Sequence, residues 1–195
     1  MAMFQDFPIG PVSLEFGGDA LGETHGGATL TVDQETVKTY ADKTGRVARY
    51  KVRVGRQVML KAALTEPTLE QMAKILGATV SKGTVSSELV LQSGVGTDLT
   101  ANAKTLVLKP IIDDAVSTDE ADWIYIPKAS IDAKCEVPYN YEGQRVWAFE
   151  AEAHPVLAAD IAEDGFLYNG GTPEYAAGDL IRFGKKADEE ASNPE

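Results

Sequence analysis

The sequence is poor in the residue types that build catalytic and metal sites. Its 195 residues include one cysteine, Cys135, and two histidines, His25 and His154. One cysteine excludes an intramolecular disulfide and the multi-cysteine patterns of zinc sites, and it fits a reducing compartment. The first fifteen residues lack a secretory signal, and no apolar run approaches the roughly 20 residues that a membrane span requires. We therefore expect a protein that is neither exported nor membrane-bound.

Known catalytic motifs are also missing. The sequence contains no phosphate-binding loop, no dinucleotide fingerprint after a strand and no nucleophile motif such as the G-x-S-x-G elbow to pair with either histidine. The acidic residues between positions 113 and 122 lack the spacing of a calcium loop, which indicates a solvated loop. Cys135 falls on the apolar face of its predicted strand, so we expect it in the core. We predict a non-enzyme without cofactor or metal; a site assembled from Glu150, Glu152 and His154 stays as the enzymatic alternative.

The composition is that of a folded domain. Hydrophobic residues make up 44% of the chain and charged residues 25%, enough apolar material for one compact core. No repeat or linker divides the chain, so residues 1–183 are predicted to form a single domain. The segment 184–195 has no apolar anchor and is expected to be disordered.

Alternation of apolar and polar residues dominates the chain and predicts a mainly β fold. The expected strands cover residues 12–16, 28–40, 49–64, 105–112, 123–137, 145–154 and 180–183, with weaker strands at 78–85 and 89–92. The strand 123–137 places Trp123, Tyr125, Ala129, Ile131, Ala133, Cys135 and Val137 on its apolar face.

The strand 49–64 shows the strongest pattern. Its predicted buried face carries Tyr50, Val52, Val54, Val58, Leu60, Ala62 and Leu64, and its opposite face carries Arg49, Lys51, Arg53, Gln57 and Lys61. Gly55, in the middle of the strand, indicates a bulge or a bend.

One short helix is predicted over about residues 67–76. Pro67 suits the first turn, and Thr68 with Gln71 has the spacing of a capping box. Apolar residues recur at the helical period and Gly77 ends the pattern. Because a helix of about three turns is not stable alone in water, it must pack against the sheet.

Charge is segregated along the chain. The formal net charge is -12, yet residues 38–61 hold eight basic side chains and one acid, a local charge of +7. Residues 110–195 hold 19 acids and six bases, a charge of -13. The overall negative charge argues against tight binding of nucleic acid. On the expected strand 145–154, Glu150 and Glu152 share a polar face, and cross-strand pairing with Lys128 and Lys134 is the favoured interpretation.

The basic side chains Arg49, Lys51 and Arg53 of the expected strand 49–64 have two interpretations. In the first, these side chains contact phosphate groups of nucleic acid; the lack of interleaved aromatic residues disfavours this interpretation. Alternatively they meet carboxylates, either in their own sheet at Asp33 and Glu35 or across a subunit boundary, where electrostatic complementarity selects the partner.

Three stretches resemble the tail tube (major tail) proteins of long-tailed bacteriophages. They are the pattern from Gly18 to Val32 with the loop at 41–45, the strand and helix from Val54 to Gly77, and the block from Ile126 to Pro155 closed by Gly178 to Gly184. Residues 78–104 match nothing in this pattern. The order and spacing of the stretches carry the resemblance.

The resemblance implies a β-sandwich or barrel-like tail-tube domain with one flanking helix. It implies hexameric rings that stack into a hollow tube, through which the genome passes into the host without specific binding. Partners would be further copies of the chain and the tape measure, terminator and tail-tip proteins, with assembly in the bacterial host cytoplasm and a final location in the virion tail. Related tube folds occur in the contractile type VI secretion apparatus.

Six copies in a ring would carry a formal charge of -72, so opposite charges are expected to meet at their contacts. The candidate subunit-interface residues are Lys38, Lys43, Arg46, Arg49, Lys51, Arg53 and Arg56. The candidate acidic residues of the lumen or interface are Asp33, Glu35, Asp132, Glu136, Glu150 and Glu152. Alternatives are a tail terminator, a secretion-tube-like ring protein and, less favoured, a nucleic-acid-binding β-barrel module.

Overall fold

The computed structural model describes residues 11–40, 43, 47–65, 67–82, 87–91, 94–96, 98–132, 146–162, 165–167 and 175–184. Its strands are β1 (Val12–Phe16), β2 (Asp19–Thr39), β3 (Tyr50–Thr65), β4 (Thr79–Lys82), β5 (Ser87–Val90), β6 (Lys104–Ile112), β7 (Ala115–Val116), β8 (Ile124–Asp132), β9 (Val146–Ala153) and β10 (Arg182–Phe183). The helices are α1 (Leu69–Leu76) and the short 3-10 helix η2 (Glu120–Asp122). The predicted mainly β fold with one short α-helix is confirmed. The predictions for Arg46, Lys134, Cys135, Glu136 and the tail after Gly184 lie outside the described residues.

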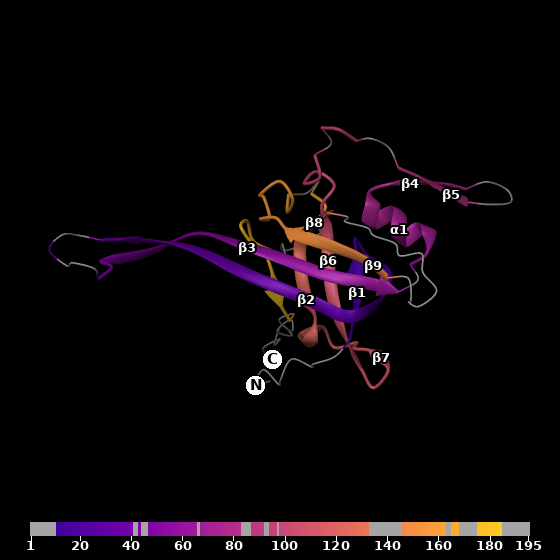
Figure 1. Cartoon of the computed structure of the whole chain (residues 1–195), viewed down its shortest axis with the longest axis horizontal. Coiled ribbons are helices and arrows are strands. Elements are labelled where there is room, and N and C mark those ends of the chain that lie inside the picture. Colours follow the sequence, from indigo (N-terminus) through magenta and orange to yellow (C-terminus); the bar gives the residue numbers. More distant parts are fainter. Residues whose placement is uncertain are drawn as a thin grey trace, which may run out of the picture.

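The large sheet closes on itself into a barrel. Its strand order is β10-β8-β9-β3-β2-β1-β6-β7, and an additional antiparallel pairing joins β6 to β8. The closed circuit therefore runs β8-β9-β3-β2-β1-β6 and back to β8. Figure 1 shows these strands around one axis, with α1 and the β4–β5 hairpin at one end. Closure pairs the edges that an open sheet would leave exposed.

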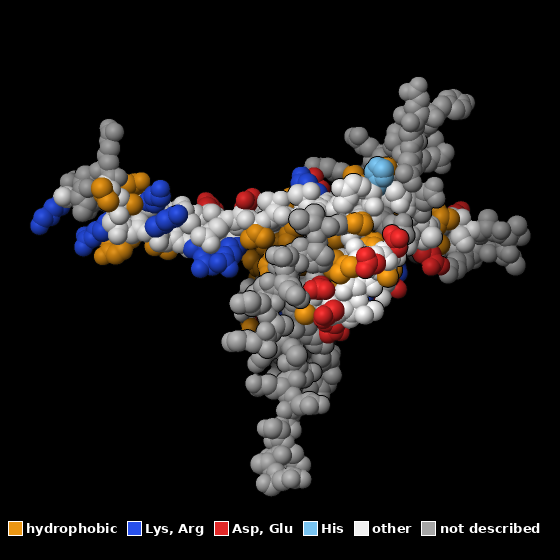
Figure 2. All heavy atoms as spheres, turned by 90° about the horizontal axis from the view of Figure 1, so that it is seen from below, with side chains coloured by type: hydrophobic (Ala, Val, Ile, Leu, Met, Phe, Trp, Pro, Cys, Tyr) orange, Lys and Arg blue, Asp and Glu red, His pale blue; other side chains and the backbone are white. Residues whose placement is uncertain are grey.

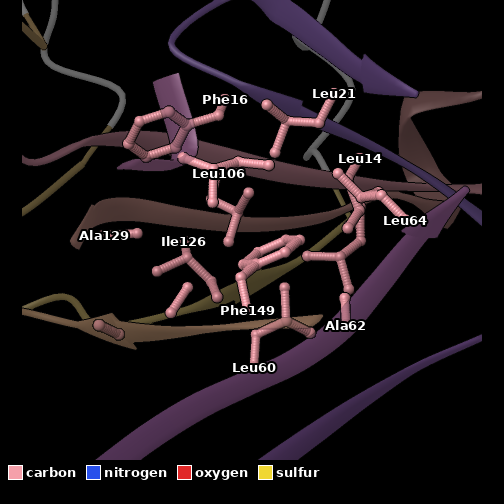
Figure 3. Close-up of a cluster of buried hydrophobic side chains, with 14 of the residues drawn as sticks. Leu14, Phe16, Leu21, Leu60, Ala62, Leu64, Leu106, Ile126, Ala129 and Phe149 are labelled. Atoms are coloured by element: carbon pink, nitrogen blue, oxygen red, sulfur yellow. The ribbon is translucent and has the colours of Figure 1, made fainter. Parts of the chain in front are cut away.

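The barrel interior is the hydrophobic core. Leu14, Leu21, Leu60, Leu64, Leu106, Ile126 and Phe149 have almost no exposed surface. Figure 3 shows the Phe149 ring among side chains from β1, β3, β6 and β8. One face of β9 lines the core, since Phe149, Ala151 and Ala153 are all buried.

The predicted face of β8 is wrong in its first half. Ile126 and Ala129 are both fully buried in the core, although they differ by an odd number of positions. The register between β6 and β8 explains this, because Lys104 lies opposite Ala129 whereas Leu106 lies opposite Ile126. An extra residue in β8 shifts the alternation, so Tyr125 lies outside the barrel interior. There its ring lies under the Arg182 guanidinium, 4.6 Å from the ring centroid.

The helix α1 packs against the sheet as the sequence predicts, at one end of the barrel (Figure 1). Thr68 accepts a hydrogen bond from the Gln71 backbone N–H, and the Gln71 side chain accepts one from the Thr68 N–H. Gly77 ends the helix in the left-handed conformation at φ 60°. Ile75 packs into the core cluster, and Lys74 forms an ion pair with Asp19 at 2.6 Å. The helix is therefore joined to the β1–β2 turn by both apolar and polar contacts.

Candidate assembly surfaces

The most unusual feature is a two-stranded arm that extends from the barrel. β2 and β3 pair from Thr24 to Thr39, but β1 pairs with β2 only up to Glu23, and β9 pairs with β3 only from Met59 onward. We call residues 28–39 of β2 and 50–58 of β3 the arm. Figure 1 shows it reaching far beyond the barrel. In the described part of the chain, both outer edges of this ribbon lack a neighbouring strand.

A β-bulge in the arm exchanges its two faces. Glu35 lies opposite Gly55, whereas the next residue, Thr36, lies opposite Arg53, so Val54 is an extra residue in β3. The bulge that Gly55 indicates in the sequence is therefore present. The bulge places the side chains of residues 50–53 on the faces opposite to those expected, because side-chain alternation restarts out of phase beyond Val54. The prediction that Tyr50 and Val52 share a face with Val58 is wrong.

Cross-strand pairs define the two faces, since directly opposite residues share a face. On the side that continues the barrel interior, Val32 lies opposite Val58 and Gln34 opposite Arg56. Farther out on this side, Thr36 lies opposite Arg53, and Lys38 lies opposite Lys51. We call Lys38, Lys51, Arg53 and Arg56 the basic face. Figure 2 shows Lys and Arg side chains gathered along the arm.

The basic face has no carboxylate partner within the described part of the chain. The alternative of pairing inside the sheet with Asp33 and Glu35 is wrong, because these acids lie on the opposite face, across from Gln57 and Gly55. The other two described interface candidates lie near the tip, where Lys43 is exposed. There the Arg49 guanidinium lies 5.3 Å from the centroid of the Tyr50 ring.

The other side of the distal arm is apolar and exposed. Val37 lies opposite Val52, and Thr39 lies opposite Tyr50. Val37 is 49% exposed, Val52 57% and Tyr50 59%. The predicted burial of β3 is therefore correct from Val58 to Leu64 and wrong for the outer half. Such a concentration of exposed apolar side chains on one element is typical of a surface that binds a partner.

At its base the arm forms a groove with the segment before β10. Val32, Val58, Arg53 and Arg56 line one side, and Gly178 to Ile181 line the other, around a volume of about 380 Å³. Both arginines therefore stand at the rim where the arm leaves the barrel. The location agrees with the strand register, which places all four side chains on one face.

The five described acidic candidates share the opposite, outer surface of β2, β3, β9 and β8. Asp33 and Glu35 lie on β2, Glu150 and Glu152 on β9, and Asp132 on β8. Asp132, Glu150 and Glu152 alternate with residues of the core, whereas Asp33 and Glu35 lie on the arm, opposite Gln57 and Gly55. We call these five residues the acidic face. The sequence did not indicate that β2 and β9 both flank β3, which is what brings these carboxylates onto one surface.

Two polar contacts on this surface differ from the predicted pairing. Glu150 accepts a hydrogen bond from Lys61 Nζ at 2.8 Å, and Glu152 accepts one from Gln57 Nε2 at 3.1 Å. Lys128 instead donates to both carboxylate oxygens of Asp160. The predicted pairing of Lys128 with β9 is wrong because the loop after β9 covers this lysine. Only knowledge of that loop's path would have revealed Asp160 as its partner.

The three residues of the enzymatic alternative, Glu150, Glu152 and His154, each contact a different side chain. Glu150 and Glu152 bond to Lys61 and Gln57, while His154 Nε2 lies 2.7 Å from Ser130 Oγ. Within the described residues, no three or more His, Cys, Asp or Glu side chains are grouped to hold a metal ion. The described helices also include none with the length and apolar character needed to cross a membrane.

Comparison with known proteins gives a remote structural likeness. No protein-family model matches the sequence, and no curated protein matches it. Among solved structures, the fold is similar to Hcp1 from Flavobacterium johnsoniae, with a TM-score of 0.33 and 13% sequence identity. The likeness covers 73% of this chain and 89% of that chain. A likeness of this degree does not indicate a function, so the function of this chain depends on the evidence of its own surfaces.

Proposed function

We propose that this chain is a structural subunit that assembles with copies of itself into a ring, and by stacking of rings into a tube. The arm is the observation that supports this proposal. A two-stranded ribbon is marginally stable in water by itself. This one also exposes an apolar side and a basic side without carboxylate partners in the described chain. A neighbouring copy would cover both.

In its specific form, the proposal is a tail tube protein of a long-tailed bacteriophage. Hexameric rings would stack into a conduit for the genome, joined by tape measure, terminator and tail-tip proteins, in a virion assembled in the host cytoplasm. The net charge of -12 suits such a conduit. Carboxylates repel phosphates within a Debye length of about 8 Å at physiological salt, so DNA would slide without being held.

A second candidate is a ring that does not stack, such as a tail terminator or a secretion-tube-like ring protein. The same arm supports it, because an arm that reaches sideways closes a ring without any contact between rings. The two candidates differ in the size of the assembly. Sedimentation velocity of the purified protein separates a single sharp boundary for one ring from a broad, concentration-dependent distribution for a tube.

The experiment that tests self-assembly is negative-stain electron microscopy of the concentrated protein. We expect rings or tubes from the unaltered chain and isolated particles from the triple variant Arg49→Glu, Lys51→Glu and Arg53→Glu. Circular dichroism checks that the barrel remains folded in the variant. Normal tubes from the triple variant would contradict the role of the arm, and a wild-type chain that stays monomeric at all concentrations would contradict self-assembly.

A further inference from the structure

We propose that the basic face of the arm in one copy docks on the acidic face of a second copy. This inference rests on the proposed self-assembly and specifies the surface that receives the arm. The donor surface is Lys38, Lys51, Arg53 and Arg56, and the receiving surface is Asp33, Glu35, Asp132, Glu150 and Glu152. The two surfaces carry opposite charge on opposite faces of strands in the same sheet.

The receiving surface is electrostatically unfavourable in an isolated copy. Asp132 on β8 lies directly opposite Glu150 on β9, and like charges in that position destabilise a strand pair. Glu152 occupies the next position on the same face of β9. Lys61 contacts Glu150, whereas Lys128, on the outside of β8, is paired with Asp160 and not with these carboxylates. Additional cations from outside would therefore stabilise it.

The donor surface has the complementary defect. Lys38 lies directly opposite Lys51, so two positive charges face each other across the ribbon. Arg53 and Arg56 follow towards the barrel, so cations occupy three successive same-face pairs. Same-face residues on a strand are separated by about 6.6 Å, whichever sheet they belong to. The cations of the arm and the carboxylates of β8 and β9 thus repeat at similar spacing, and contact would relieve repulsion on both surfaces.

Among the described residues, the acidic face of a copy cannot reach the basic face of its own arm. The basic residues and Asp33 or Glu35 point to opposite sides of the β2–β3 ribbon, and the remaining acids lie on β8 and β9 behind the same sheet. Asp179 lines the same groove as Arg53 and Arg56, but its carboxylate accepts a hydrogen bond from the Ala176 N–H and forms no ion pair with either arginine. An acidic face that meets this arm therefore belongs to a second copy. Since the two surfaces differ, a docked pair still offers one free arm and one free acidic face. Such a heterologous contact continues until it closes a ring or forms an open helical filament.

Nucleic acid is the less favoured occupant of the basic face. Proteins that bind single strands combine cations with aromatic rings on one surface, so that bases stack while phosphates are neutralised. Here Tyr50 lies on the apolar side of the arm, opposite to Lys51 and Arg53. The chain itself, in contrast, provides an acidic surface of opposite charge on β8 and β9.

A charge exchange between the two surfaces tests this pairing. The arm variant combines Lys51→Glu, Arg53→Glu and Arg56→Glu, and the acceptor variant combines Asp132→Lys and Glu152→Lys. In sedimentation velocity, each variant alone should remain monomeric at the concentrations at which wild type assembles. Its critical concentration for assembly should be at least about tenfold higher than that of wild type. An equimolar mixture should assemble, because each altered surface then finds an unaltered or oppositely altered partner. One chain carrying all five substitutions should also assemble.

The matched control is Glu88→Lys, a charge reversal on an exposed strand residue of β5, outside both surfaces. It should assemble like wild type, whereas Glu152→Lys alone should weaken assembly. Thermal melting checks that every variant is folded. An acceptor variant that assembles normally overturns this pairing but leaves the proposed self-assembly standing, whereas a monomeric wild-type chain overturns both. Failure of the folded mixture to assemble overturns the pairing, as does a basic face that binds short DNA while contributing nothing to assembly.

Discussion

Lys128 donates hydrogen bonds from Nζ to both carboxylate oxygens of Asp160, at 3.0 and 2.8 Å. The two side chains are only 9% and 12% exposed, and Asp160 also accepts a hydrogen bond from the Leu157 backbone N–H. The pair joins the loop after β9 to the outside of β8. In the same loop, Val156 exchanges backbone hydrogen bonds with Gly178 and Asp179, which line the groove at the base of the arm.

Breaking this pair should destabilise the fold. Asp160→Asn leaves the Lys128 ammonium nearly buried without its counter-charge, a change that costs about 3 kcal/mol in comparable sites. Urea denaturation measures the free energy of unfolding. The control is Lys61→Met, which removes the more exposed pair with Glu150 and should cost no more than about 1 kcal/mol. Equal losses in both variants would show that the Lys128–Asp160 pair has no special weight.

The same pair makes stability sensitive to acid. Burial raises the pKa of Asp160, but the hydrogen bonds from Lys128 and Leu157 and the charge of Lys128 outweigh it, so the pKa lies below its usual range. A depressed carboxyl pKa contributes stability that is complete above the unfolded value of about 3.9 and is lost as pH falls through the folded value. Unfolding free energy should therefore decline below about pH 4, and less steeply in Asp160→Asn. Identical acid profiles would contradict this.

The bulge at Val54 can be tested by changing the residue count on either strand. Inserting one threonine between Glu35 and Thr36 pairs the extra residue and moves Lys38, Lys51 and Arg53 to the other side of the ribbon. Deleting Val54 removes the bulge but leaves these side chains on their present face. We expect the insertion to abolish assembly and the deletion to retain it, both with melting temperatures near wild type. Assembly of the insertion variant in sedimentation velocity would contradict the assigned faces.

Phe149 at the centre of the barrel should be the most sensitive core position. Its ring is 1% exposed and belongs to the cluster shown in Figure 3. Truncation in Phe149→Ala should reduce the free energy of unfolding by about 3–5 kcal/mol, because it removes buried surface and leaves a cavity. Phe183→Ala, at a residue that is 44% exposed, is the control and should cost much less. Denaturant titrations measure both variants, and comparable losses of unfolding free energy would contradict the central position of Phe149 in the core.

The helix cap provides a smaller and more local effect. Thr68→Ala removes the side-chain acceptor of the Gln71 N–H and should cost about 1 kcal/mol. Thr68→Ser keeps the hydroxyl and should restore most of that loss. Both values come from chemical denaturation of the whole chain. A Thr68→Ser variant as unstable as Thr68→Ala would exclude the cap as the cause.

The candidate surfaces were only partly predictable from the sequence. Local patterns correctly indicated most strands, the helix with its cap at Thr68 and the bulge near Gly55, because each depends on neighbouring residues. They missed β7 and the first part of β2, which begins at Asp19 and not at residue 28. They failed at Tyr50 and Val52, which have the alternation of a buried strand and yet lie in the arm. Alternation records which residues share a face in a regular strand; it does not record a bulge's phase change or whether another layer covers that face.

The sequence by itself determined a mainly β chain, the separation of basic residues 38–61 from the acidic second half, and the apolar residues of β9 and of β3 beyond Val58. Only the tertiary structure decided that β6 pairs with β8 to close a barrel, that the outer half of the β2–β3 hairpin leaves it, and that Asp160 meets Lys128. These features depend on contacts between residues far apart in the chain. No local periodicity specifies such contacts, because the strands that flank a given strand are set by how the whole sheet closes around its core.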